Sequence, residues 1–357
     1  MNPTSLIPAP DPIPVHWGWL KLLLLTTFFL HLLCMNTMLG IGIIALVKSL
    51  FDRSGAVEYN REISEKLPYT IAFTVNMGVA PLLFIQVLYG QFIYTSSLLM
   101  AVYWLSITGI LIIAYYSAYI YQYTFDDAGP ALVGFMSITV ISLLVIGFFF
   151  SNNMTMMLSP EKWTRYFTSP GGTLLNLADP TLIPRYLHFV LSALAVGGLF
   201  MALLWEHKAG GDKAIYRKKI QYSLNWFMAA TLLQFGVGTW WLMALPTHIV
   251  RLFMGGNTWA TSFFALGFIG SILALFFGYK ARVRLCTGTT LATILCMVLM
   301  RDHLRTAMLN PYFTLSTLEV DPQYGSLVLF LVFLGLGIIA IFYMFKLAFR
   351  NTPEVGS

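Results

Sequence analysis

Ionisable side chains inside long apolar segments are the residues of this sequence that could do chemistry. The segment LMRDHLRTAML (299–309) places two arginines, an aspartate and a histidine within five residues at the end of an apolar run. His31 lies well inside another apolar run, and Arg185 and His188 stand at the start of a third. Because a charge in a bilayer costs about 3 kcal/mol unless it is paired, hydrated or bound, these positions predict a site.

Histidines and arginines gathered at one depth are typical of a non-covalently held haem. Imidazole is a common axial ligand of haem iron, and arginines neutralise propionates. Arg301 and Arg305 are four residues apart and Asp302 and Arg305 are three apart, so Arg305 can share a helical face with each in turn. No C-x-x-C-H motif for covalent attachment occurs. The candidate metal ligands are His31, His188 and His303, and the further cofactor-binding candidates are Asp302, Arg185, Arg301 and Arg305.

Structural roles for the same residues compete with this interpretation. His188 could be a hydrogen-bonded structural residue, and Arg185 and Arg305 could extend to the headgroups. His31 is weighted toward function because histidines in mid-membrane are uncommon. The seventeen methionines are core candidates, and no pattern singles one out. No residue is assigned a catalytic role from the sequence.

The elements that must position these residues are membrane-spanning helices. The chain of 357 residues is 58% hydrophobic and 10% charged, and it contains nine apolar runs of the length that crosses a bilayer. We expect an all-α polytopic membrane bundle with one domain at 20–349, an extended arm at 1–19 and a short tail at 350–357. The expected helices span 20–49, 67–92, 95–123, 132–157, 184–206, 220–245, 257–280, 286–308 and 326–348.

Lysines and arginines in the connections predict the orientation. Basic residues concentrate in alternate connections, such as 208–219 and 280–284, and are sparser in the others. We therefore expect the N-terminus outside and the C-terminus inside, with His31, His188 and the 301–305 cluster in the outer half of the bilayer. The net charge of +6 is then an orientation signal, which argues against nucleic-acid binding.

The sequence resembles subunit I, the large haem-binding subunit, of the cytochrome bd oxidases. PRYLHFVLSALAVGGLF is similar to the fifth helix of that family, which begins with a haem-ligating histidine, here His188. His31 falls where the family carries the ligand of its oxygen-reactive haem, and Asp302 with Arg305 is similar to a ligating glutamate with an arginine three residues later. VNMGVAPLLFIQVLYG and SNNMTMMLSP resemble the second helix and the end of the fourth.

The sequence departs from that family at three places. The connection after the sixth helix is only PTHIVRLFMGGN, where the family has a long quinol loop. Phe263 and Ala265 stand where the seventh helix of the family has an arginine and a ligating methionine. The third expected helix lacks acidic residues for proton delivery, and Gln86 replaces an acid in the second.

The resemblance implies a divergent, shortened bd-type subunit of a respiratory electron-transfer complex in the bacterial inner membrane. It implies haem b, more than one haem and a site of the haem d kind, in contact with lipid and a second membrane subunit. Because the quinol loop is missing, we expect electron exchange with a periplasmic c-type cytochrome, with the quinone pool as a further partner. This would make the chain an oxidoreductase, with terminal oxidase activity left open.

Two other functions remain open from the sequence. A transporter could use the outer His, Arg and Asp residues to bind a substrate, and Pro81, Gly197 and Gly198 could interrupt its helices. A haem-free assembly anchor of a cytochrome complex would also account for the missing ligands. Haem absorbance of the purified protein separates the electron-transfer function from both.

Overall fold

The computed structural model describes residues 3–127, 129–210 and 213–350. Within these residues, nine helices are long and apolar enough to cross a membrane, which confirms the polytopic helical bundle. They are α1 (Trp17–Phe51), α2 (Arg53–Leu99), α3 (Ala101–Tyr123), α4 (Ala131–Met157), α5 (Leu182–Ala209), α6 (Lys213–Ala244), α8 (Thr258–Tyr279), α9 (Val283–Leu309) and α10 (Tyr324–Arg350). The shorter elements are η1 (Pro3–Leu6), η2 (Pro160–Thr168), α7 (Thr247–Arg251), η3 (Leu252–Gly256) and η4 (Leu315–Thr317).

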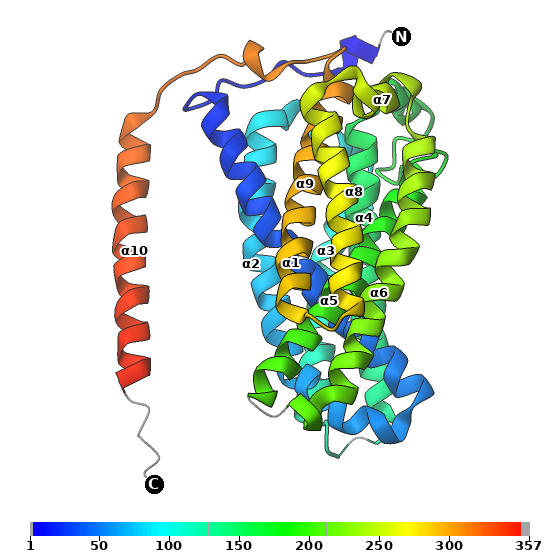
Figure 1. Ribbon diagram of the computed structural model, residues 1–357. Coiled ribbons are helices and arrows are strands. Elements are labelled where there is room, and N and C mark those ends of the chain that lie inside the picture. Colours follow the sequence, from blue (N-terminus) through cyan, green and yellow to red (C-terminus); the bar gives the residue numbers. More distant parts are fainter. Residues whose placement is uncertain (1–2, 128, 211–212, 351–357) are drawn as a thin grey trace.

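Eight of the long helices form a bundle of two groups, and α10 lies beside this bundle in Figure 1. The first group is α1 to α4, and the second is α5, α6, α8 and α9. Extensive contact between α1 and α5 joins the groups. In the second group, α5 packs along α6 and α8 packs along α9, whereas these two pairs touch each other at few positions. The second group therefore has two walls with space between them.

Glycines set the close approach of α5 to its neighbours. A Cβ added at Gly197 would lie 2.6 Å from the carbonyl carbon of Gly40 in α1, and one at Gly198 would lie 2.7 Å from the Ser223 carbonyl oxygen of α6. Helix α5 runs unbroken through both positions. These glycines therefore permit close helix crossings, and the predicted interruption of this helix at Gly197 and Gly198 does not occur. Helix α2 likewise continues through Pro81 and leaves helical geometry at Tyr89.

Several helices extend beyond their apolar cores. Helix α2 begins at Arg53, fourteen residues before the expected start at 67. The extension is polar and is tied to its neighbours by ion pairs of Glu62 with Lys208 and of Glu58 with Lys219. Hydropathy identified the membrane-embedded part, and side-chain pairing on the extension accounts for the added turns.

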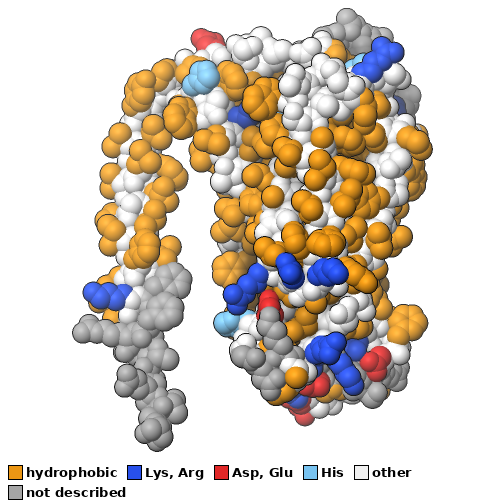
Figure 2. Space-filling view, in the orientation of Figure 1, with side chains coloured by type: hydrophobic (Ala, Val, Ile, Leu, Met, Phe, Trp, Pro, Cys, Tyr) orange, Lys and Arg blue, Asp and Glu red, His pale blue; other side chains and the backbone are white. Residues whose placement is uncertain are grey.

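The two ends of the bundle differ in character. At one end, here called the basic end, charged side chains gather where α1, α2, α5 and α6 extend, at the bottom of Figure 2. At the other, the arm end, the N-terminal segment crosses the surface, and Ile13 forms a parallel bridge with Val320. The Ile13 amide donates to the Glu319 carbonyl at 2.8 Å, and the Asp321 amide donates to the Ile13 carbonyl at 3.0 Å. This bridge fastens the arm to the segment that precedes α10.

Helix α10 stands apart from the bundle (Figure 1). Its spanning window is 0% buried, whereas that of α1 is 50% buried. A covering partner is therefore absent from this chain over the described length of α10. The expected tail lies outside the described residues from 351 onward.

The end of α4 anchors the loop that leads to α5. Asn152 Oδ1 accepts a hydrogen bond from the Asn176 amide at 2.7 Å, and Ser96 of α2 donates to Asn153 Oδ1. Both asparagines are fully buried. They thus connect α4 to α2 and to the loop, rather than only capping their own helix, and they fix where α5 begins.

Candidate functional site

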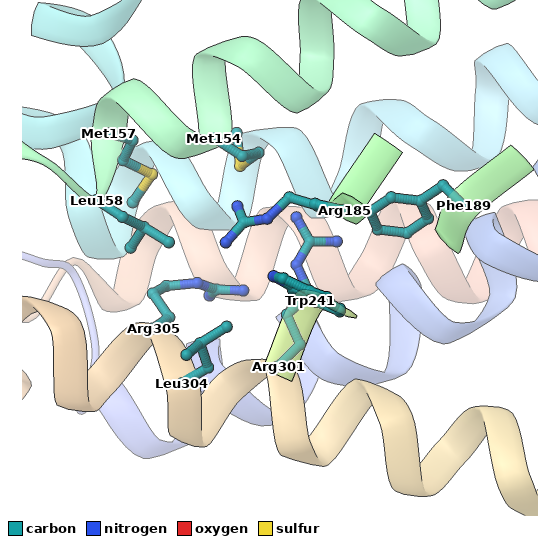
Figure 3. A pocket seen from close by; sticks show the side chains of 9 residues that line it. All are labelled: Met154, Met157, Leu158, Arg185, Phe189, Trp241, Arg301, Leu304 and Arg305. Carbon is teal, nitrogen blue, oxygen red and sulfur yellow. The ribbon is translucent and has the colours of Figure 1, made fainter. Parts of the chain in front are cut away.

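Three arginines from two helices converge near the arm end of the bundle. Arg185 comes from α5, and Arg301 and Arg305 come from successive turns of α9. Their guanidinium groups face one another around a small cavity of about 20 Å³, as Figure 3 shows. The side chains of Met154, Met157, Leu158, Phe189, Trp241 and Leu304 complete its lining. The structure therefore brings the three sequence-predicted arginines together.

The positive charge of this cluster is incompletely compensated. Asp302 is buried, and its Oδ2 pairs with Lys21 Nζ of α1 at 2.7 Å, while its Oδ1 lies 4.0 Å from Arg305 Nη1. No other carboxylate forms an ion pair with the three arginines within the described parts of the chain. Arg185 Nε and Arg305 Nη1 are buried without a hydrogen-bond partner. Unsatisfied buried guanidinium atoms point to an anion as the natural occupant.

Cation–π contacts with aromatic rings stabilise part of the positive charge of the arginines. The Arg301 guanidinium lies 4.4 Å from the Phe28 ring centre and 5.5 Å from that of Phe189. Arg185 lies 5.4 Å from the Trp241 ring, and Arg305 lies 5.2 Å from the Tyr89 ring. Such contacts contribute about 0.5–2 kcal/mol each, which is less than the cost of burying a guanidinium without a counter-ion. The aromatic contacts therefore stabilise the three arginines, but they do not compensate the positive charge fully.

A second, larger cavity adjoins the arginines. It encloses about 270 Å³ between the α5–α6 wall and the α8–α9 wall, with α1 along one side, and Arg301 lines both cavities. Its walls are mostly apolar, with phenylalanines from α1, α5, α6 and α8. The volume is close to the lower end of the ~300–1,000 Å³ range that is usual for cofactor and ligand sites.

His188 is the histidine that lines this larger cavity. Its Nδ1 is buried without a hydrogen-bond partner, and its ring lies 5.5 Å from the Trp241 ring, centre to centre. Gly238 of α6 lies against the ring, since a Cβ there would be in van der Waals contact with His188 Cε1 at 3.5 Å. Gln234 Oε1 and Asn36 Oδ1, on the same lining, also lack partners. Orphaned polar atoms around an apolar cavity indicate a site for a large, mainly apolar ligand with some polar atoms.

The other two histidines lie elsewhere. The Nδ1–H of His31 donates to the Thr74 carbonyl of α2 at 3.1 Å, and a Cβ at Gly78 would lie 2.9 Å from His31 Cε1. His303 packs against Phe263 of α8 at 5.8 Å between ring centres. Neither lines the two cavities. Within the described residues, no three His, Cys, Asp or Glu side chains are placed to hold a metal ion together, so any iron ligation by these histidines would be at separate sites.

Sequence reasoning missed three residues of the site. Lys21 has no role in the site predicted from the sequence, although it stands near the start of α1 and pairs with Asp302. Trp241 and Gln234 of α6 contact the His188 residue itself, the latter through a 3.0 Å hydrogen bond from Nε2 to the His188 carbonyl. Lys21 could have been found by matching charges at equal depth, whereas helix packing alone reveals Trp241 and Gln234.

Comparison with known proteins gives a structural match only. No family model matches the sequence, and no curated protein matches it. A solved structure described as bd oxidase from Geobacillus thermodenitrificans superposes with a TM-score of 0.64 at 13% sequence identity, over 98% of this chain and 99% of that chain. The chain has a bd-oxidase-like fold. The expectation of a distant structural relationship to the bd oxidases is thus confirmed at the level of the fold.

The match does not decide which subunit of a bd oxidase this chain resembles. Because the superposition covers nearly all of both chains, the matched chain is about as long as this one. Its description names the oxidase and leaves the subunit unstated. The resemblance to the large subunit, and the shortening relative to it, therefore stay predictions from the sequence.

Proposed function

We propose that this protein is a haem-binding membrane subunit of a respiratory electron-transfer complex. One observation carries the proposal: a mostly apolar cavity lined by His188 adjoins three arginines that lack sufficient negative charge, of which Arg185 and Arg305 are buried. A haem has matching requirements, namely an imidazole for the iron, apolar walls for the ring and cations for two propionates. The bd-oxidase-like fold supports the same class of function.

Different residues of the site would hold the iron and the propionates of the haem. His188 would ligate the iron, since its ring makes no hydrogen bond to any described residue. Arg185 and Arg301 would receive the propionates, and Arg305 would add positive charge. The Lys21–Asp302 pair favours charge compensation as the role of Asp302, in place of iron ligation. When bound, haem b supplies one-electron exchange, and the apolar walls of the chain exclude water from it.

His31 and His303 are assigned to further haem sites in this proposal. Donation from His31 Nδ1 to a backbone carbonyl leaves Nε2 unprotonated, which is the form that a metal ligand needs. His31 would thus serve a second haem, of the b or d kind, at the α1–α2 face. His303, beside Phe263, is the candidate for a third.

The electron partners follow from the position of the site. The arginines and His188 lie toward the arm end, which we assign to the outer face of a bacterial inner membrane because basic residues gather at the other end (Figure 2). A periplasmic c-type cytochrome is therefore the proposed electron partner, with quinone as the lipid-borne alternative. A second membrane subunit is proposed to cover α10, whose spanning window is 0% buried.

Haem quantification tests the proposal. A reduced-minus-oxidised spectrum and a pyridine haemochrome assay of the purified protein should show haem b, and His188→Ala should remove about one haem. His207→Ala is the matched control, because His207 is exposed at the basic end. A colourless wild-type protein would overturn the proposal and favour the transporter or the haem-free anchor. Equal haem content in both variants would overturn the role of His188.

The donor is tested separately in proteoliposomes with the arm end outward. A reduced c-type cytochrome added outside should reduce the haem in milliseconds to seconds, and oxygen consumption would then report oxidase activity. Reduction by a quinol alone, with none by the cytochrome, would reassign the donor without affecting the haem assignment.

A further inference from the structure

The wall that faces His188 across the cavity offers few groups that could bind iron. Helices α8 and α9 contribute only hydroxyl, methionine and arginine side chains among their polar or polarizable lining residues. The Ser271, Thr290 and Thr293 hydroxyls already donate to carbonyls of their own helices, at 2.9, 2.8 and 2.9 Å respectively. Arginine remains protonated and does not ligate iron. The thioethers of Met297 and Met300 are the remaining candidate iron ligands on this wall.

Position on α9 distinguishes the two methionines. The residues of α9 that line the cavity recur at helical spacing, at 290, 293–294, 297–298, 300–301 and 304. Met297 lies near the midline of this stripe, whereas Met300 lies at its edge. Met300 and Arg301 diverge to either side of it: Met300 Sδ lies 3.9 Å from a Cβ built on Gly267 of α8, whereas Arg301 contacts Phe28 and Phe189.

The depth of the residues along their helices also favours Met297 over Met300. Arg185 and Arg301 meet at one small cavity, so they mark a common level on the two walls. From that level, His188 lies three residues further along α5, toward the basic end, and Met297 lies four residues back along α9 in the same direction. At about 1.5 Å per residue these steps are about 4.5 and 6 Å, which places the imidazole and the thioether at similar depth on opposite walls.

We propose that Met297 is the axial ligand opposite His188, which rests on the haem proposal above. The sequence lacks a methionine at the corresponding place on α8, where Phe263 and Ala265 stand, and α9, which packs along α8 in the same wall, supplies one instead. A thioether ligand holds haem iron low-spin and raises its reduction potential relative to an imidazole pair. This arrangement suits acceptance of electrons from a high-potential donor such as a c-type cytochrome.

Spectroscopy of the purified, haem-loaded protein tests this ligand. The ferric wild type should be low-spin and show the weak charge-transfer absorption that iron–thioether coordination produces. Met297→Leu should retain haem, lose that absorption, become high-spin and bind carbon monoxide when reduced, with a lowered midpoint potential. Met297→His should restore the low-spin state without the thioether absorption. Met300→Leu, the matched control from the same cavity, should leave all of these properties unchanged.

The outcomes separate the two proposals. A wild type without haem overturns the proposed function and this ligand with it. Three outcomes overturn the ligand alone. The wild type binds haem but lacks the thioether absorption, or the absorption survives in Met297→Leu, or it is lost in Met300→Leu only. If Met297→Leu does not fold, the wild-type spectrum and Met297→His decide the question.

Discussion

At the scale of single residues, the chain is strained by buried positive charge. Arg185, Arg301 and Arg305 surround one small cavity, and Asp302, the acid that lies 4.0 Å from Arg305, already pairs with Lys21. Like charges at short range in a medium of low dielectric constant repel strongly. This repulsion is tolerable if an anion fills the site, and it makes the stability of the protein depend on the occupant.

Arg301→Gln should therefore have opposite effects on the two forms of the protein. In haem-free protein the substitution should leave the thermal unfolding temperature unchanged or raise it, because repulsion falls. In haem-loaded protein it should lower that temperature and weaken haem retention, because a propionate partner is lost, at about 1.5–3 kcal/mol for a charged hydrogen bond. Unfolding scans of both forms measure this, with exposed Arg251→Gln as control. Destabilisation of both forms alike would indicate that Arg301 serves packing only.

Asp179, in the loop before α5, gives a pH dependence outside the membrane. Burial alone raises the pKa of Asp179, but hydrogen bonds from Lys162 at 2.6 Å and from Thr181 outweigh burial and hold that pKa below its ordinary value. A lowered folded-state pKa stabilises the protein above the ordinary pKa of aspartate, and this stabilisation is lost as the pH falls through the folded value.

Asp179→Asn should accordingly destabilise the protein at neutral pH, by about 1–3 kcal/mol, and reduce its sensitivity to acid. Thermal unfolding measured from neutral to acidic pH should show the wild type and the variant converging at low pH. Asp11→Asn, on the exposed arm, is the control. Parallel curves that never converge would mean that Asp179 does not titrate differently on folding.

At the scale of helices, the close crossing of α1 and α5 holds the two halves of the bundle together. The crossing depends on the absence of side chains at Gly40 and Gly197, where the backbones are in contact. This crossing lies toward the basic end from His188, on the same helix α5.

Gly197→Ala should destabilise the protein by about 1–3 kcal/mol through overpacking at this crossing. Gly236→Ala in α6 is the matched control: nothing lies within 4 Å of a Cβ there, so the substitution should be neutral or should stabilise by about 0.5–1 kcal/mol. Denaturation in detergent and haem content measure both variants. Equal effects of the two substitutions would contradict the close crossing.

At the scale of the whole molecule, α10 is the element that this chain leaves without a partner. The bridge between Ile13 and Val320 fixes the segment before α10 to the arm, yet the spanning window of the helix itself is 0% buried. An apolar helix can face lipid on all sides, but a subunit of a complex is expected to shield one face.

Single spin labels along α10, from Leu327 to Leu336, should therefore show different lipid exposure in the native complex and in the isolated chain. In the complex, labels at helical spacing should be protected from a lipid-soluble quencher, and in the isolated chain all should be accessible. Labels on Leu105 of α3, which is 75% exposed, provide the lipid-facing reference. Uniform access in both preparations would show that α10 faces lipid and that another surface joins the complex.

Much of this architecture could be predicted from the sequence because hydropathy reports membrane burial directly. The nine spans were correctly identified, and α3 and α4 end where expected, at Tyr123 and Met157. Charges in apolar runs likewise marked Arg185, Arg301 and Arg305, since their burial requires a special reason. The start of α2 was wrong because ion pairs, which hydropathy does not register, extend that helix.

The sequence by itself thus determined the class of protein and which apolar segments carry its ionisable residues, since both depend on transfer from water to lipid along one chain. Only the tertiary structure decided which residues share a site. It placed the three arginines around one small cavity and His188 on the larger cavity that Arg301 also lines, turned His31 toward α2 and His303 toward α8, and brought Lys21 to Asp302. Helix rotation and pairing set these contacts, and they depend on packing between segments distant in sequence, such as Gly40 against Gly197.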